Sequence, residues 1–148
     1  MHVVVCLCLL VRAHNDAWCI ENPATSRLWL APRIRRLGQL RGVEKVMTDM
    51  CQWGSSWRKS TSLWAWGLDL ASFQDVRCQG SKRGTCSRTG LPHFRLEGKD
   101  SAGNWKTKRG EVYPTPLAVA LARSFANVMV ARIAARFEEM IGNASLFR

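Results

Sequence analysis

The residues best suited to chemistry are three cysteines and one histidine in the middle of the chain. Cys78, Cys86 and His93 are separated by seven and six residues within a Gly-rich basic stretch, and Cys51 is available as a fourth ligand. Thiolate sulfur and imidazole nitrogen are the donors that a tetrahedral zinc ion prefers. The four residues therefore predict a Cys3His zinc site. Because the spacing contains no Cys-x2-Cys pair, a loop of free thiols is the alternative interpretation.

The charge of the chain favours a polyanionic partner. Its 148 residues include 22 Lys and Arg against 11 Asp and Glu, a net charge of +11. Nucleic acid is the commonest partner of such a chain. Two basic blocks, Arg27–Lys45 and Lys82–Arg109, predict a phosphate-directed face for DNA or RNA; two solvated loops with a chance bias are the alternative. The candidate contacts within the blocks are Arg35, Arg36, Lys82, Arg83 and Arg88.

The composition indicates a globular protein. Apolar residues make up 47% of the chain and charged residues 22%, which excludes a wholly disordered chain, a collagen and a multi-span membrane protein. The apolar run Val3–Val11 is too short for a transmembrane helix and lacks the basic residues that precede a signal sequence. The irregular cysteine spacing does not suggest a disulfide framework. We expect an intracellular protein, nuclear or cytoplasmic, with no membrane partner and no secretion.

Three segments are predicted to form strands. They are Ala17–Ile20, Glu44–Met50 and Ser62–Leu68. The first ends abruptly at Glu21–Pro23, as a buried parallel strand does when polar residues follow its carboxyl end.

The remaining elements are predicted to be helical. Val3–His14 is either a buried helix or a strand, because a short apolar run does not separate the two. Ser26–Leu40 favours helical turns, with Pro32 opening one of them. Leu117–Met140 has helix-favouring residues and a wide apolar stripe, and Gly142 is its expected stop.

The order of these motifs resembles the second half of the catalytic domain of DNA cytosine-C5 methyltransferases. In that family a strand ends in Glu-Asn-Val, and phage and protist relatives carry Glu-Asn-Pro, as in Glu21–Pro23 here. A later aromatic-Gly segment rich in Arg and Lys corresponds to Trp53–Thr61. The phage-like branch also tends to carry a Cys- and His-containing insert and a Tyr-Pro helix start, matched by Cys78–His93 and Tyr113–Leu117. The resemblance covers residues 15–126.

The resemblance implies roles for individual residues. In the family a Cys adds to C6 of a flipped-out cytosine while a carboxylic acid supports the charge at N3. Glu21 would be that acid, and Asn22 would fix the turn. Lys59 and Arg58 would contact the flipped nucleotide and its phosphate, which makes Glu21 and Lys59 the catalytic candidates. Thr61 stands where most members have a second Arg.

Plainer interpretations of the same residues remain open. Glu21 is equally well explained as a strand-end carboxylate that caps a neighbouring helix. Arg58 and Lys59 are equally well explained as surface charges.

Two motifs of the family have no counterpart in the sequence. A Gly-rich Phe-x-Gly-x-Gly turn for S-adenosylmethionine and a Pro-Cys dipeptide with the nucleophile are both missing. We therefore expect a fragment of a methyltransferase-like protein, inactive alone, that retains phosphate-directed nucleic-acid binding. S-adenosylmethionine would belong to the complete family and zinc to this chain. The alternatives are a small zinc-binding nucleic-acid module, and half of a split methyltransferase that needs a complementary half as its partner.

The expected fold class is α/β. The pattern predicts a partial Rossmann-like (class I methyltransferase-like) sheet of about three strands with a long C-terminal helix. Residues 1–148 would form a single incomplete domain, with the methyltransferase-like region at 15–126 and a basic Cys/His-containing loop insert at 76–110. Such a sheet would have an open edge.

Overall fold

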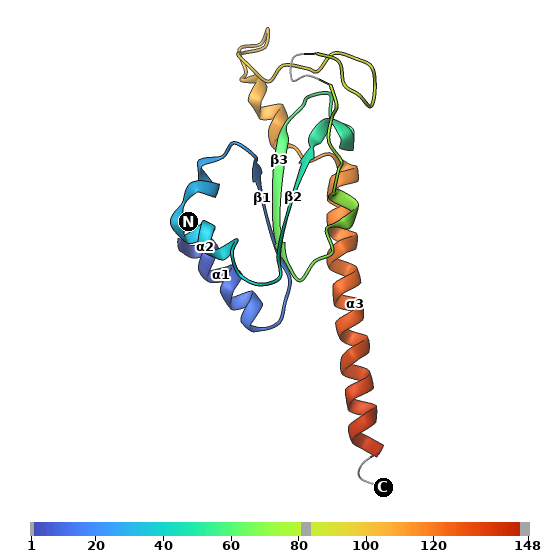
Figure 1. Cartoon of the computed structure of the whole chain (residues 1–148). Coiled ribbons are helices and arrows are strands. Elements are labelled where there is room, and N and C mark those ends of the chain that lie inside the picture. Colours follow the sequence, from blue (N-terminus) through green and yellow to red (C-terminus); the bar gives the residue numbers. More distant parts are fainter. Residues whose placement is uncertain (1, 81–83, 146–148) are drawn as a thin grey trace.

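A three-stranded sheet with helices on both faces forms the centre of the computed structural model, which describes residues 2–80 and 84–145 (Figure 1). The α-helices and strands are, in chain order, α1 (His2–Ala13), β1 (Trp18–Pro23), α2 (Pro32–Leu37), β2 (Val43–Asp49), β3 (Ser60–Trp66) and α3 (Thr115–Ser145). Short 3-10 helices connect them: η1 (Arg27–Leu30), η2 (Met50–Trp53), η3 (Ala71–Phe73) and η4 (Lys106–Glu111). The α/β class, the three strands and the long C-terminal helix agree with the sequence prediction.

The sheet has the strand order β1-β3-β2, with β3 antiparallel to both neighbours. β1 and β2 therefore run in the same direction and are joined by a crossover through η1 and α2. The prediction that the first strand is a buried parallel strand is wrong, because β1 lies at the edge of the sheet and pairs only with the antiparallel β3. This edge position is compatible with Pro23, whose missing N–H would disrupt a central strand.

The carboxyl end of β1 also differs from the expectation. The strand continues through Pro23, so Glu21 and Asn22 lie within it, opposite Leu63 and Ser62 of β3. Asn22 therefore does not fix a turn, as the family resemblance had implied. The physical reason is that β3 is long enough to pair with β1 past Ile20 and hold these polar residues in the ladder.

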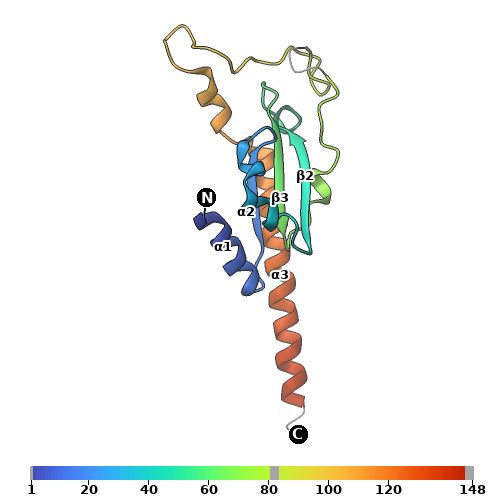
Figure 2. The same cartoon turned by 60° about the vertical axis from the view of Figure 1, so that its left-hand side comes forward.

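Each face of the sheet carries its own apolar cluster, because alternate side chains of a strand point to opposite faces. On one face Leu63 and Ala65 of β3 join Phe73 and Leu117, which start the contact with α3. The cluster on the other face consists of residues from β1, α1 and α2: Val5, Cys8, Trp18, Ile20, Ile34 and Leu37. Figure 2 shows α1 and α2 on the side of the sheet away from α3.

Several local predictions are resolved by the structure. Val3–His14 is a helix, and Pro32 opens α2 as expected. The predicted stop at Gly142 is wrong, since α3 continues to Ser145. Of the two cysteines on α1, Cys8 is buried and Cys6 is exposed.

The second half of α3 extends beyond the sheet (Figure 1). Its apolar side chains Met129, Ile133 and Phe137 are 62%, 52% and 60% exposed. The segment Lys106–Ile141 is long and apolar enough to cross a membrane by length and composition alone. A single helix of this kind is weak evidence, so this finding by itself assigns no membrane partner.

The contact between α3 and the sheet makes a stability prediction. Leu117 is completely buried, so Leu117→Ala should lower the free energy of unfolding by about 2–5 kcal/mol through lost burial and a residual cavity. Met129→Ala, on the exposed part of the same helix, should change it by less than about 0.5 kcal/mol. Urea denaturation followed by circular dichroism measures both. Equal effects of the two variants would contradict this packing.

Candidate metal centre and basic cavity

The structure brings together the four predicted metal ligands. The ligand atoms of Cys51, Cys78, Cys86 and His93 all lie within 4.8 Å of one another, and all four residues are buried. Tetrahedral zinc bonded to sulfur and nitrogen sets ligand separations of about 3.5–3.8 Å. The distance from Cys78 Sγ to His93 Nε2 is 3.5 Å. This buried Cys3His cluster can hold a metal such as zinc.

The four ligands lie in two irregular segments of the chain. Cys51 lies in η2, directly after β2, and Gly54 ends this turn with a left-handed φ of 111°. Cys86 and His93 come from a tight loop in which the Cys86 N–H donates to the Leu91 carbonyl at 2.8 Å. Gly80 lies close to this loop: a Cβ on it would be 1.8 Å from the Thr85 carbonyl oxygen. A glycine is therefore required where the chain passes from Cys78 to the loop.

The cysteines of the cluster differ in acidity. Burial raises the pKa of the Cys51 thiol to about 12. Burial also acts to raise the pKa of Cys78, but hydrogen bonds from the Ser87 backbone N–H and hydroxyl and from the Gly80 N–H lower it to about 6. Metal binding requires thiolates. Cys78 is thus ready to bind at neutral pH, whereas Cys51 must lose its proton when a metal enters.

Hydrogen bonds from neighbouring residues surround the cluster. The Gln52 side-chain amide donates to Cys51 Sγ at 3.6 Å and to Cys86 Sγ at 3.7 Å. Arg88, a predicted nucleic-acid contact, donates from Nε to the Cys51 carbonyl at 2.6 Å. Its charge is therefore fixed next to the cluster, while the side chain as a whole remains exposed.

The other predicted phosphate contacts are spread over the molecule. Arg35 and Arg36 are exposed on α2, which packs against α1 and η1. Lys82 and Arg83 lie outside the described residues. The structure thus groups Arg88 and Arg58 near the metal ligands and places Arg35 and Arg36 on a separate helix.

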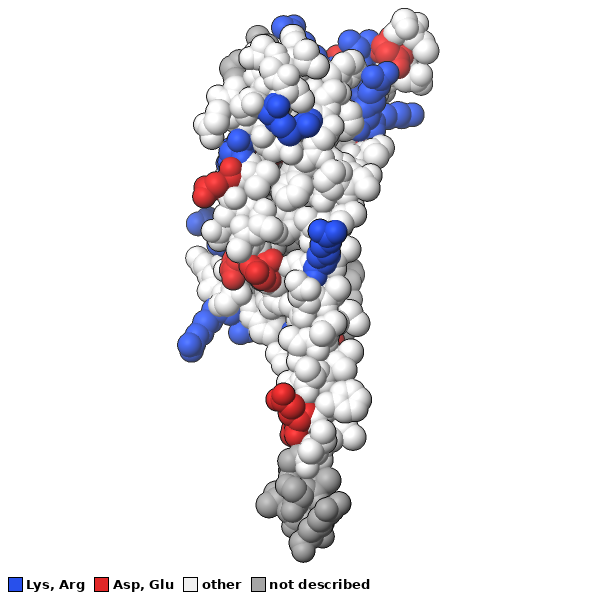
Figure 3. All heavy atoms as spheres, turned by 90° about the vertical axis from the view of Figure 1, so that its right-hand side faces the viewer, with Lys and Arg blue, Asp and Glu red and all other residues white. Residues whose placement is uncertain are grey.

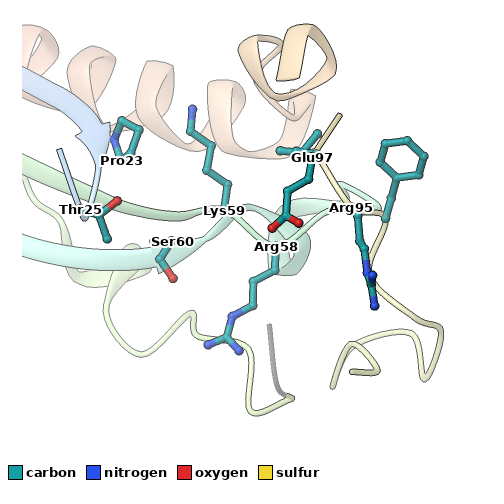
Figure 4. A pocket seen from close by; sticks show the side chains of 9 residues that line it. Pro23, Thr25, Arg58, Lys59, Ser60, Arg95 and Glu97 are labelled. Carbon is teal, nitrogen blue, oxygen red and sulfur yellow. The ribbon is translucent and has the colours of Figure 1, made fainter. Parts of the chain in front are cut away.

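A cavity of about 430 Å³ opens at the end of the sheet, beside the metal loop. Its lining includes the cations Arg58, Lys59 and Arg95 and the carboxylate of Glu97. Figure 4 shows Arg58 and Lys59 leaving the chain in opposite directions, although they are adjacent in sequence. Sequence reasoning singled out the first two cations but not Arg95, whose only signal was its place within the second basic block.

Glu21 and Lys59, the two catalytic candidates, both contact the segment that leads into α3. Lys59 Nζ donates to the Gly110 carbonyl at 3.2 Å, and the Tyr113 hydroxyl donates to Glu21 Oε2. Burial and the neighbouring Glu21 raise the pKa of Tyr113. The other carboxylate oxygen, Oε1, is buried without a hydrogen-bond partner among the described residues. Glu21 therefore acts as a hydrogen-bond acceptor for Tyr113, not as a helix cap.

The cluster predicts which cysteines retain a metal. Cys86→Ser removes one soft ligand and should strip zinc from the chain during gel filtration, whereas Cys6→Ser should retain one zinc ion per chain. Inductively coupled plasma mass spectrometry of the two variants and the unchanged protein measures this. Loss of zinc in both variants, or in neither, would contradict the assignment of ligands.

The comparisons with known proteins do not assign the chain to a family. No family model matches it, and neither a curated protein nor a solved structure shows detectable similarity. The Cys3His cluster and the cavity beside it are therefore the features that indicate a function.

Proposed function

We propose that this chain is a zinc-binding, nucleic-acid-binding module. The Cys3His cluster carries the proposal: Cys51, Cys78, Cys86 and His93 would hold the ion, and the ion would fix a basic loop beside the cavity. Zinc would have a structural role, because all four positions of a tetrahedral site are filled by protein ligands.

The architecture of the loop supports a structural metal. Between β3 and α3 the described chain has only short 3-10 turns and isolated bridges. After Phe73, the buried apolar residues of the described part of this region are Cys78 and Cys86, which form a cluster with Cys51. This cluster is too small to order a loop by apolar burial. In such segments the free energy of metal binding is the folding free energy.

The charge around the cavity supports a phosphate ligand. Arg58, Lys59 and Arg95 line it together with Glu97, and Arg88 lies beside the metal ligands. Figure 3 shows further Lys and Arg side chains at the same end of the molecule, with few charges along α3. Contacts of this kind bind the nucleic-acid backbone without reading its sequence. The resemblance to DNA methyltransferases makes DNA the first nucleic acid to test.

Charge variants test the cavity as a phosphate site. Arg95→Gln should weaken binding to a labelled DNA duplex. It should also lower the slope of log affinity against log salt concentration by the contribution of about one phosphate contact. Glu97→Gln should strengthen binding, because it removes the negative charge of the cavity. Arg123→Gln takes the same charge from exposed α3 and should leave the salt dependence unchanged. Fluorescence anisotropy over a salt series measures all three, and equal effects of Arg95→Gln and Arg123→Gln would contradict the proposal.

A second candidate function is half of a methyltransferase that works with a complementary half. Two observations favour it: β1 presents a free sheet edge to which a further strand can add, and Glu21 has a buried carboxylate oxygen without a partner among the described residues. In that reading Glu21 would protonate the cytosine and Lys59 would hold its phosphate.

Methyl transfer from labelled S-adenosylmethionine to DNA separates the two candidates when the chain is mixed with a methyltransferase half that carries the donor turn and the Pro-Cys nucleophile. The zinc-binding module predicts that adding the chain produces no methyl transfer. Transfer by the mixture that Glu21→Gln abolishes, with Glu138→Gln on the exposed part of α3 as the matched control, would instead establish the methyltransferase function.

A further inference from the structure

We infer that metal occupancy of the Cys3His centre sets the affinity of the basic cavity for a phosphate group, with Asp49 as the positioning residue that joins the two sites. The inference rests on the proposed function and extends it, because it makes metal and nucleic acid bind cooperatively.

Asp49 is tied directly to the metal-binding segment. Its side chain is completely buried at the end of β2, two residues before the ligand Cys51. The backbone N–H of the ligand Cys78 donates to Asp49 Oδ2 at 2.9 Å, and Arg77 Nε donates to the same oxygen at 3.1 Å. One buried carboxylate therefore holds the backbone of the ligand Cys78 close to the segment that carries Cys51.

The same carboxylate holds a cation of the cavity. Arg58 Nη2 lies 3.5 Å from Asp49 Oδ2, and Arg58 Nη1 donates to the carbonyl of Gly80, two residues after Cys78. Only 19% of the Arg58 side chain is exposed. The position of Arg58 in the cavity thus depends on both Asp49 and the metal-binding segment.

Loss of the metal removes one of these two supports. The segment from Arg77 to Gly80 is irregular, so its position depends on the ligands at its end and on the hydrogen bonds to Asp49. Without an ion, the Gly80 carbonyl is free to move away, and Arg58 is left with the Asp49 carboxylate alone. The guanidinium, which pairs with Asp49 in either state, then no longer has a fixed orientation, and the cavity loses a positioned cation for phosphate.

Simple electrostatics does not produce this coupling. A zinc ion with three thiolates and a neutral imidazole carries a net charge of about −1, so the loaded centre does not itself attract a phosphate. Tighter phosphate binding by the metal-loaded chain would therefore reflect the placement of Arg58.

The test compares two adjacent cations of the cavity. Anisotropy of a labelled DNA duplex measures affinity for the full chain loaded with zinc, and for the chain stripped by a chelator under reducing conditions. We expect the stripped chain to bind about five- to tenfold more weakly, at the low end of typical coupling between sites. Arg58→Met should bring this ratio to about one. Lys59→Met should weaken both forms and keep the ratio, since Lys59 bonds to Gly110 and not to Asp49.

Thermodynamic linkage supplies an independent readout: saturating DNA should raise the affinity for zinc by the same factor. Equal DNA affinity of loaded and stripped chains would overturn the inference while leaving the proposed function intact. An unchanged ratio in Arg58→Met would also overturn it, because general unfolding on metal removal gives that result. The same loss of ratio in both variants would overturn it as well, because the effect would then not be specific to Arg58. A chain that takes up no zinc, or a loaded chain that binds no DNA, refutes the proposed function itself.

Discussion

A buried carboxylate is stable in a protein only where hydrogen bonds and positive charge replace its lost hydration. Asp49 is such a carboxylate, and three parts of the chain supply its partners. Its oxygens accept hydrogen bonds from the Ser60 hydroxyl at the start of β3 and from the Cys78 backbone. Burial alone would raise the pKa of Asp49, but these bonds, together with Arg77 and Arg58, hold it below its usual value. The end of the sheet, the metal-binding segment and the cavity are consequently built around one charge.

The sheet and α3 provide the rigid base for this end of the molecule. β3 is paired on both sides and places Thr61 and Leu63 in its buried middle. Leu117 and the buried Ser124 anchor α3 to that face, and the Ser124 hydroxyl donates to the Asp69 carbonyl. Arg58 and Lys59 directly precede β3, so the paired strand fixes the end of the segment that carries them. This origin explains why two neighbouring cations can have separate and defined contacts.

Local patterns were sufficient to predict most of the elements and the ligand set. The distribution of apolar and helix-favouring residues predicts the three strands, the start of α2 at Pro32 and the long C-terminal helix. Cys51 was assigned to the cluster with Cys78, Cys86 and His93 on donor chemistry alone, and the four ligand atoms do converge.

The rest depended on contacts between residues far apart in sequence. The antiparallel pairing of β1 with β3 is set by their register, which no pattern within β1 encodes. The role of Asp49 was not foreseen, because its partners Arg58, Arg77 and Cys78 are separated from it by 9 to 29 positions. An acidic residue at the buried end of β2 was the signal available for it, and the charged Glu44 and Lys45 of the same strand made it inconspicuous.

X-ray absorption at the zinc edge of the purified chain is the most direct test of the central claim. The account predicts a spectrum with three sulfur neighbours at about 2.3 Å and one nitrogen at about 2.0–2.1 Å. A spectrum dominated by oxygen and nitrogen neighbours, or protein that retains no zinc, would contradict the Cys3His centre and with it the proposed function.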